Sequence, residues 1–120
     1  MPGSAAATAP MAVRPLSSTG IAAVVKTELE SVKFVVRDFR ASLGGNPVGN
    51  NAEITKALMG ANRKKTHFLD GANLRLNDKG ELIDRWDTPY FFHQISGIEM
   101  EIRSAGPDKR MWTDDDIIIR

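Results

Sequence analysis

Apolar residues recur every three or four positions between residues 21 and 43, which is the spacing of one face of an α-helix. The apolar stripe consists of Ile21, Val25, Leu29, Val32, Val36, Phe39 and Leu43. Residues 17–19 are all Ser or Thr and can cap the start of this helix, and Gly44-Gly45 ends it. The pattern predicts a long amphipathic helix whose stripe, with Val32, Val36 and Phe39 near its centre, packs against a sheet.

Near the end of the chain the periodicity changes to the alternation expected of half-buried β-strands. Tyr90 and Phe92 fall on one face of a first segment, and Met100 and Ile102 fall on one face of a second. The turn signal Ser96-Gly97 separates the two segments. They are predicted to form an antiparallel hairpin with one buried face, between residues 89–95 and residues 99–104.

Two shorter segments fill the middle of the chain. Asn50 or Asn51 can cap a short helix over residues 52–59, and Gly60 ends it. The apolar pair Leu82-Ile83 is expected to insert into the core just before a turn. Together these segments predict an α+β fold, a long N-terminal helix packed on a small three- to four-stranded antiparallel sheet.

The chain divides at about residue 18. Residues 1–18 are rich in Ala, Pro, Ser and Gly without periodicity, which predicts a flexible leader or linker ahead of one domain over residues 19–120. This start differs from a signal peptide, because Arg14 is its only basic residue and no continuous apolar region follows a basic start. No run approaches the roughly 18 apolar residues that a membrane helix needs.

Composition narrows the function classes. The 120 residues include 16 Lys and Arg and 15 Asp and Glu, so the net charge is +1 and no basic stripe indicates a nucleic-acid partner. The chain has no cysteine, which excludes a disulfide framework, a zinc-thiolate site and cysteine catalysis. Its only histidines, His67 and His93, lack the neighbouring motifs of a hydrolase or a zinc protease. We therefore expect a protein that is not an enzyme.

An acidic loop precedes the final apolar run at residues 117–119. Its acids are Asp108, Asp114, Asp115 and Asp116. Their carboxylates repel one another unless a positive charge lies among them. Lys109 and Arg110 could supply that charge, and so could Ca²⁺, which takes six to eight oxygens from carboxylates and loop carbonyls. The spacing is not that of an EF-hand, so the residues alone leave both explanations open.

Two stretches resemble a known family. Residues 84–90, which read DRWDTPY, resemble the DPWGTPY or DPWGNPY motif of the major pseudopilins of type II secretion. Residues 104–108, SAGPD, followed by residues 113–117, TDDDI, resemble the terminal loop of such proteins, SAGPDGxFGTxDDI. The chain departs from both motifs where Asp87, Lys109 and Trp112 replace family glycines.

The resemblance implies a metal site and a packed turn. The family's terminal loop binds calcium, which implies here a Ca²⁺ ion held by side-chain oxygens of Asp108, Asp115 and Asp116. A carbonyl oxygen from Ser104 or Met111 would complete the shell. In the first motif, Asp84 is expected to hold the turn through backbone hydrogen bonds, with the rings of Trp86 and Tyr90 largely buried.

The resemblance also implies a function and a location. It predicts a non-enzymatic structural component of a secretion or pilus-type assembly, with other pseudopilin or secretion-system subunits as partners. The domain would lack the transmembrane half of the family's long helix, and would be periplasmic or associated with the inner membrane if an anchor precedes it. The alternative is a free-standing soluble module that binds a protein or another ligand.

Overall fold

The computed structural model of the chain describes residues 18–69 and 74–120. Its elements are the helices α2 (Ser18–Leu43) and α3 (Asn51–Leu58) and the strands β1 (Arg75–Leu76), β2 (Leu82–Ile83), β3 (Phe91–Ser96), β4 (Glu99–Ser104) and β5 (Ile117–Ile119). The predicted leader lies, except for its last residue, outside the described residues. Neither described helix is long and apolar enough to cross a membrane.

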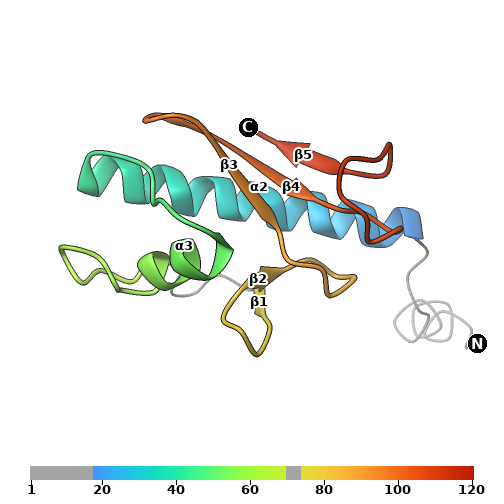
Figure 1. Cartoon of the computed structure of the whole chain (residues 1–120), viewed down its shortest axis with the longest axis horizontal. Helices are drawn as coiled ribbons and strands as arrows, with labels where there is room; N and C mark the ends of the chain where they lie inside the picture. The colour runs from blue at the N-terminus through green and yellow to red at the C-terminus, as the bar shows by residue number, and fades with distance from the viewer. Residues whose placement is uncertain (1–17, 70–73) are drawn as a thin grey trace, which may run out of the picture.

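The long helix α2 lies across an antiparallel sheet in which β4 is the central strand between β3 and β5 (Figure 1). A separate two-stranded ribbon pairs β1 with β2. This arrangement confirms the predicted α+β architecture of a long helix on a small antiparallel sheet. The sheet has three strands, at the lower end of the expected range.

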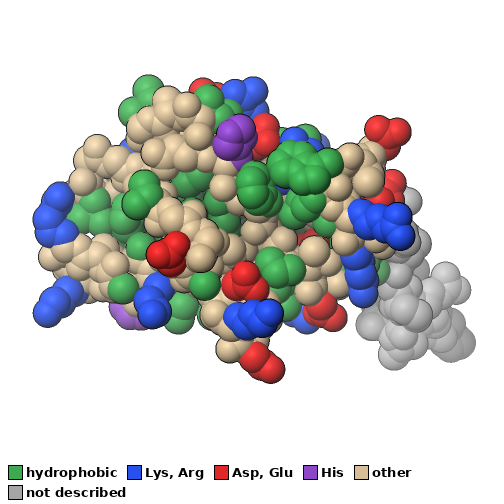
Figure 2. Space-filling model, in the orientation of Figure 1, with side chains coloured by type: hydrophobic (Ala, Val, Ile, Leu, Met, Phe, Trp, Pro, Cys, Tyr) green, Lys and Arg blue, Asp and Glu red, His purple; other side chains and the backbone are tan. Residues whose placement is uncertain are grey.

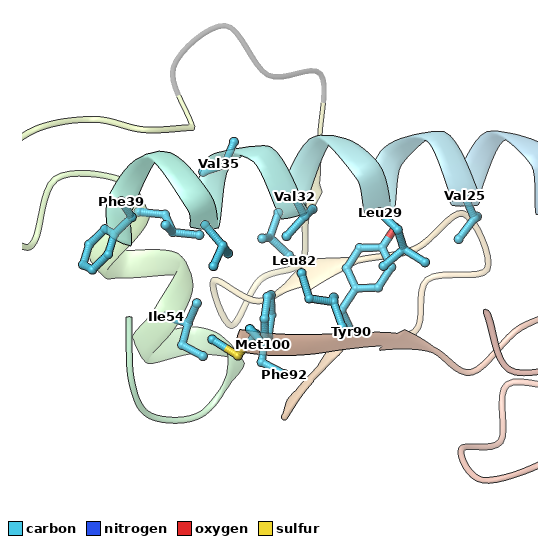
Figure 3. Close-up of a cluster of buried hydrophobic side chains, with 13 residues drawn as sticks. Val25, Leu29, Val32, Val35, Phe39, Ile54, Leu82, Tyr90, Phe92 and Met100 are labelled. Carbon is cyan, nitrogen blue, oxygen red and sulfur yellow. The ribbon is translucent and has the colours of Figure 1, made fainter. Parts of the chain in front are cut away.

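The predicted apolar stripe of α2 forms one side of the core. Val32 and Val36 are 0% and 1% exposed, and Phe39 is 7% exposed. Figure 3 shows the side chains of Leu29 and Val32 directed toward Leu82 and the strand residues on the other side of the core. Phe39 also packs edge to face against Phe68, with ring centroids 5.3 Å apart. The helical periodicity therefore identified the buried face correctly.

The end of α2 is closed by glycine and by basic side chains. Gly44 adopts a φ of 86° and donates its N–H to the carbonyl oxygen of Arg40 at 2.8 Å. Lys64 Nζ and Arg63 Nη2 donate to the carbonyl oxygens of Ser42 and Leu43. These cations meet the negative end of the helix dipole, so the basic turn after α3 stabilises the end of α2.

A capping box begins α3. Asn50 accepts the N–H of Glu53, and the Glu53 carboxylate accepts the N–H of Asn50. The next residue, Asn51, is buried and acts differently. Its side-chain amide donates to the carbonyl oxygens of Leu82 and Tyr90, and its Oδ1 accepts the N–H of Leu82. Asn51 thus attaches α3 to β2 and to the residue before β3.

The two faces of the hairpin match the predicted alternation. Phe92, Met100 and Ile102 are buried against α2, whereas Phe91 is 39% exposed on the outer face. Pairing sets Phe91 opposite Arg103, and Arg103 opposite Ile118 of β5. One row of outer-face residues therefore crosses all three strands.

Candidate functional site

The turn between β2 and β3 is built around the carboxylate of Asp84, which is fully buried. Its Oδ1 accepts the N–H groups of Trp86 and Thr88 at 2.9 and 3.0 Å. The N–H of Asp84 donates to the carbonyl oxygen of Thr88 and closes the turn. The expectation that Asp84 holds this turn through backbone hydrogen bonds is confirmed.

The second oxygen of Asp84 joins the turn to the acidic loop. Ser104 Oγ, also fully buried, donates to Asp84 Oδ2 at 2.7 Å. The same Ser104 Oγ accepts the N–H of Gly106, the first glycine of the loop. The two stretches that resemble one family, twenty residues apart in the chain, are therefore in direct contact.

The two aromatic rings of the turn have different environments. Tyr90 is 2% exposed, as predicted, and its ring lies among core side chains below α2 (Figure 3). Trp86 is partly buried and packs against the edge of the core. Trp86 is the middle residue of the turn, which the hydrogen bond from Asp84 to Thr88 closes.

The loop between β4 and β5 is organised by hydrogen bonds to its acids. Thr113 Oγ1 donates to Asp108 Oδ2 at 2.7 Å, and Asp108 Oδ1 accepts the N–H of Arg110. Gly106, at a φ of 78°, lies so close to the carbonyl oxygen of Asp115 that an added Cβ would be 2.1 Å from it. Only glycine fits this crossing of the loop.

Asp116 is the acid most tightly held by the protein. Its Oδ2 accepts Arg103 Nη1 and the N–H of Trp112, each at 2.7 Å. Burial of the carboxyl works against its ionisation and raises its pKa, but the hydrogen bonds from Arg103, Trp112 and Thr113 outweigh burial. The pKa of Asp116 therefore lies below its ordinary value.

Two of the predicted calcium ligands, Asp108 and Asp116, are engaged with protein partners. Asp116 is paired with Arg103, Asp108 accepts Thr113, and Asp115 is exposed beside them. Ser104 is buried under the loop and Met111 is partly buried within it. Among residues 18–69 and 74–120, no three His, Cys, Asp or Glu side chains are grouped to hold a metal ion. Arg103 already neutralises Asp116 through its Oδ2, and the calcium site stays a prediction.

Neither Lys109 nor Arg110, the cations considered from the sequence, forms an ion pair with a described residue. Arg103 on β4 supplies the positive charge instead, thirteen residues before Asp116. Arg103 lies on the outer face of the hairpin, opposite the predicted buried face, so the sequence did not identify it as a partner of Asp116.

Three non-glycine residues of the turn and the loop have a backbone conformation that favours glycine. Asp87, Lys109 and Trp112 have φ values of 65°, 59° and 70°, in the left-handed region that favours glycine. These are the three positions at which the chain departs from the family glycines. Lys65, at 53°, is the other non-glycine residue of the described chain in this region.

Aromatic side chains gather on the outer face of the sheet beside the loop. The ring of Trp112 meets the edge of Phe91 with centroids 5.2 Å apart, and the Arg103 guanidinium lies 4.5 Å from the Trp112 centroid. His93 lies on the same strand, 3.8 Å from Glu101. Figure 2 shows a histidine beside large hydrophobic side chains on this face. The sequence does not indicate this cluster, because Phe91 and the loop residue Trp112 are far apart in the chain and meet only in the folded structure.

The chain matches no protein-family model, no curated protein and no solved structure.

Proposed function

We propose that the chain is a non-enzymatic structural subunit of a secretion or pilus-type assembly, similar to a type II secretion pseudopilin. The observation that carries the proposal is the backbone of Asp87, Lys109 and Trp112. A motif keeps glycine where the backbone needs a positive φ. This chain has other residues there, yet their φ values are positive, which is what retention of the motif's backbone predicts.

A second observation supports the same proposal. The turn motif and the loop motif bond to each other through Asp84 and Ser104, so they act as one structural unit. This unit lies beside a long helix packed on a small antiparallel sheet, the layout that the resemblance implies. The proposed partners are other subunits of the same assembly, and the proposed location is the periplasm or the periplasmic side of the inner membrane.

The role can be tested in the organism that encodes the chain. We expect deletion of the gene to reduce the export of specific proteins into the medium, measured by mass spectrometry of the culture supernatant. Wild-type protein should restore export, whereas Asp84→Ala, which removes the link between the motifs, should not. An unchanged set of exported proteins in the deletion strain would contradict the proposal.

Calcium binding by the loop is part of the proposal. Asp108, Asp115 and Asp116 would donate side-chain oxygens, with a carbonyl oxygen from Ser104 or Met111. A ligand that binds only the folded state stabilises it by about 2.7 kcal/mol at a hundredfold excess over its dissociation constant.

The measurement for calcium is a thermal melt of metal-stripped protein in EDTA and in millimolar calcium. We expect calcium to raise the melting temperature of wild type but not of Asp115→Ala. Asp114→Ala is the matched control and should keep the response, because Asp114 occupies a variable position of the motif. Identical wild-type melts with and without calcium would exclude the site.

The alternative, a free-standing binding module, is favoured by one feature, the exposed aromatic cluster of Phe91 and Trp112. Large exposed apolar side chains next to one another are typical of binding surfaces. Deletion of the gene separates the two functions, because a free-standing module predicts normal export.

A further inference from the structure

Trp112 is exposed at the surface and is contacted by two side chains of the sheet. Its residue is 64% exposed, although tryptophan is among the most apolar side chains of the loop. Phe91 and Arg103 contact the ring from the sheet, and Asp116 accepts the backbone N–H at 2.7 Å. A bulky residue held at a φ of 70° costs free energy, and such strain is often retained where it serves a function.

Two exposed acids follow this ring in the loop. Asp114 and Asp115 are both exposed, and neither side chain forms an ion pair with any residue in the described ranges. We call Trp112, Asp114 and Asp115 the acidic Trp tip. It combines one large apolar ring with two free negative charges.

A groove of opposite character lies between α3 and the β1–β2 ribbon. Its volume is about 370 Å³, and Met59 and Leu76, 39% and 40% exposed, form its apolar walls. Lys56 and Lys79 line the same groove, and neither is ion-paired within residues 18–69 and 74–120. Glu53 also lines the groove, and its carboxylate accepts the N–H of Asn50. We call this the lysine groove.

We infer that the acidic Trp tip of one copy of the chain docks into the lysine groove of the next copy. The apolar walls suit an indole ring, and the two lysines complement Asp114 and Asp115. The groove is large enough for one aromatic side chain and lies at the lower end of ligand-pocket sizes. Trp is also the residue type most enriched among interface anchors.

The acidic Trp tip and the lysine groove lie apart on one molecule, so they cannot bind each other within the same chain. In Figure 1 the loop before β5 is beside the start of α2, whereas α3 is beside its end. A contact between unlike surfaces is heterologous and repeats from copy to copy in a ring or a filament. The inference rests on the proposed role of an assembly subunit, and it names the faces that would contact each other.

The size of the contact sets its expected strength. One aromatic side chain buries about 150–250 Å², which is far below the roughly 1,200 Å² of a stable protein interface. The isolated chain should therefore be a monomer in dilute solution. The contact becomes significant where subunits are already held in an array, because linkage raises the effective concentration.

Because the chain has no cysteine, single cysteines can trap this weak contact. Arg110→Cys marks the tip, and Asp78→Cys, next to the groove residue Lys79, marks the groove; both positions are exposed. The two purified variants are mixed in a glutathione redox buffer, and the share of disulfide heterodimer is measured. We expect it to exceed the statistical share, whereas Ile98→Cys, exposed at the hairpin turn, should give only the statistical share with Asp78→Cys.

Two further variants test the chemistry of the contact. Adding Trp112→Ala to the Arg110→Cys chain should lower the heterodimer equilibrium constant about tenfold or more, as for an interface anchor. Asp114→Lys and Lys79→Asp should each weaken trapping, and the two together should restore it. Circular dichroism melts of every variant show that each is folded.

The inference is overturned if the tip and groove variants pair no more than the Ile98→Cys control, or if Trp112→Ala leaves trapping unchanged. A dominant homodimer of Arg110→Cys would also overturn it, since the Trp surface would then pair with itself. Trapping uses purified protein and leaves calcium ligands intact, so its failure is distinguishable from failure of the export test. If the heterodimer forms as expected but the deletion strain exports normally, the contact between copies is supported and the proposed secretion role is contradicted.

Discussion

The turn at residues 84–88 and the loop at residues 105–116 both depend on aspartates, but they surround the carboxylates differently. Asp84 is fully buried, and three donors from the turn and from β4 occupy its oxygens. In the loop, Asp108, Asp114 and Asp115 are exposed, and only Asp116 is drawn inward, by Arg103.

This difference shows how burial decides what a carboxylate can do. A buried carboxylate must be fully hydrogen-bonded, so Asp84 serves the structure and is unavailable to any ligand. An exposed carboxylate remains hydrated at little cost and can exchange partners. The turn is therefore a fixed structural unit, and the loop carries the carboxylates for which we propose an ion or a second copy as partner.

The largest expected effect comes from Asp84→Ala in the turn. It leaves two backbone N–H groups and the buried Ser104 hydroxyl without their acceptor. We expect a loss of about 3–5 kcal/mol in the free energy of unfolding, measured by urea denaturation. Asp114→Ala in the loop is the control and should change it by less than about 0.5 kcal/mol. Similar losses in both variants would remove the distinction between the two regions.

Arg103→Ala tests which cation neutralises the loop. It removes the partner of Asp116 and should cost about 1.5–3 kcal/mol, as expected for hydrogen bonds between charged groups. Arg110→Ala should cost less than about 0.5 kcal/mol, because its side chain is exposed. The thermal response to calcium should also be larger in Arg103→Ala than in wild type, since Asp116 is released. If both substitutions lower the free energy of unfolding equally, Arg103 is not the main cation that neutralises the loop.

Lys109→Gly probes the strained backbone of the loop. Lys109 has a φ of 59°, where an L-residue pays about 1–2 kcal/mol that glycine avoids. Glycine also raises the entropy of the unfolded chain, which offsets part of this relief. We therefore expect the free energy of unfolding, measured by thermal melts, to rise by about 0.5–1 kcal/mol. Arg110→Gly, next to it at an ordinary φ, should lose a similar amount. A loss in both variants would show that Lys109 is not strained.

The smallest expected change is a pH dependence from Asp116. Its pKa is lowered in the folded state, so its ionised form stabilises the protein above the unfolded pKa of about 3.9. That contribution is lost as the pH falls through the folded value. The difference in unfolding free energy between wild type and Asp116→Asn should therefore shrink below about pH 4. A difference that stays constant from neutral to acidic pH would contradict the pairing with Arg103.

Local signals predicted most elements of the fold. The periodicity of α2 and the glycines after it gave the helix and its buried face, because both depend on residues within a few positions. The hairpin and its faces followed from alternation and from Ser96-Gly97. Asn51 was recognised only as a helix cap, however, and its bonds to Leu82 and Tyr90 were not foreseen.

The sequence by itself determined the two helices, the hairpin, their apolar faces and the places where two family-like motifs occur, since these are properties of neighbouring residues. It did not predict the ribbon of β1 and β2. Only the tertiary structure decided that Ser104 meets Asp84, that Arg103 meets Asp116 and that Trp112 rests on Phe91. The physical reason is range. Hydrogen bonds and ring contacts act over a few ångströms, and strand pairing decides which distant residues come that close.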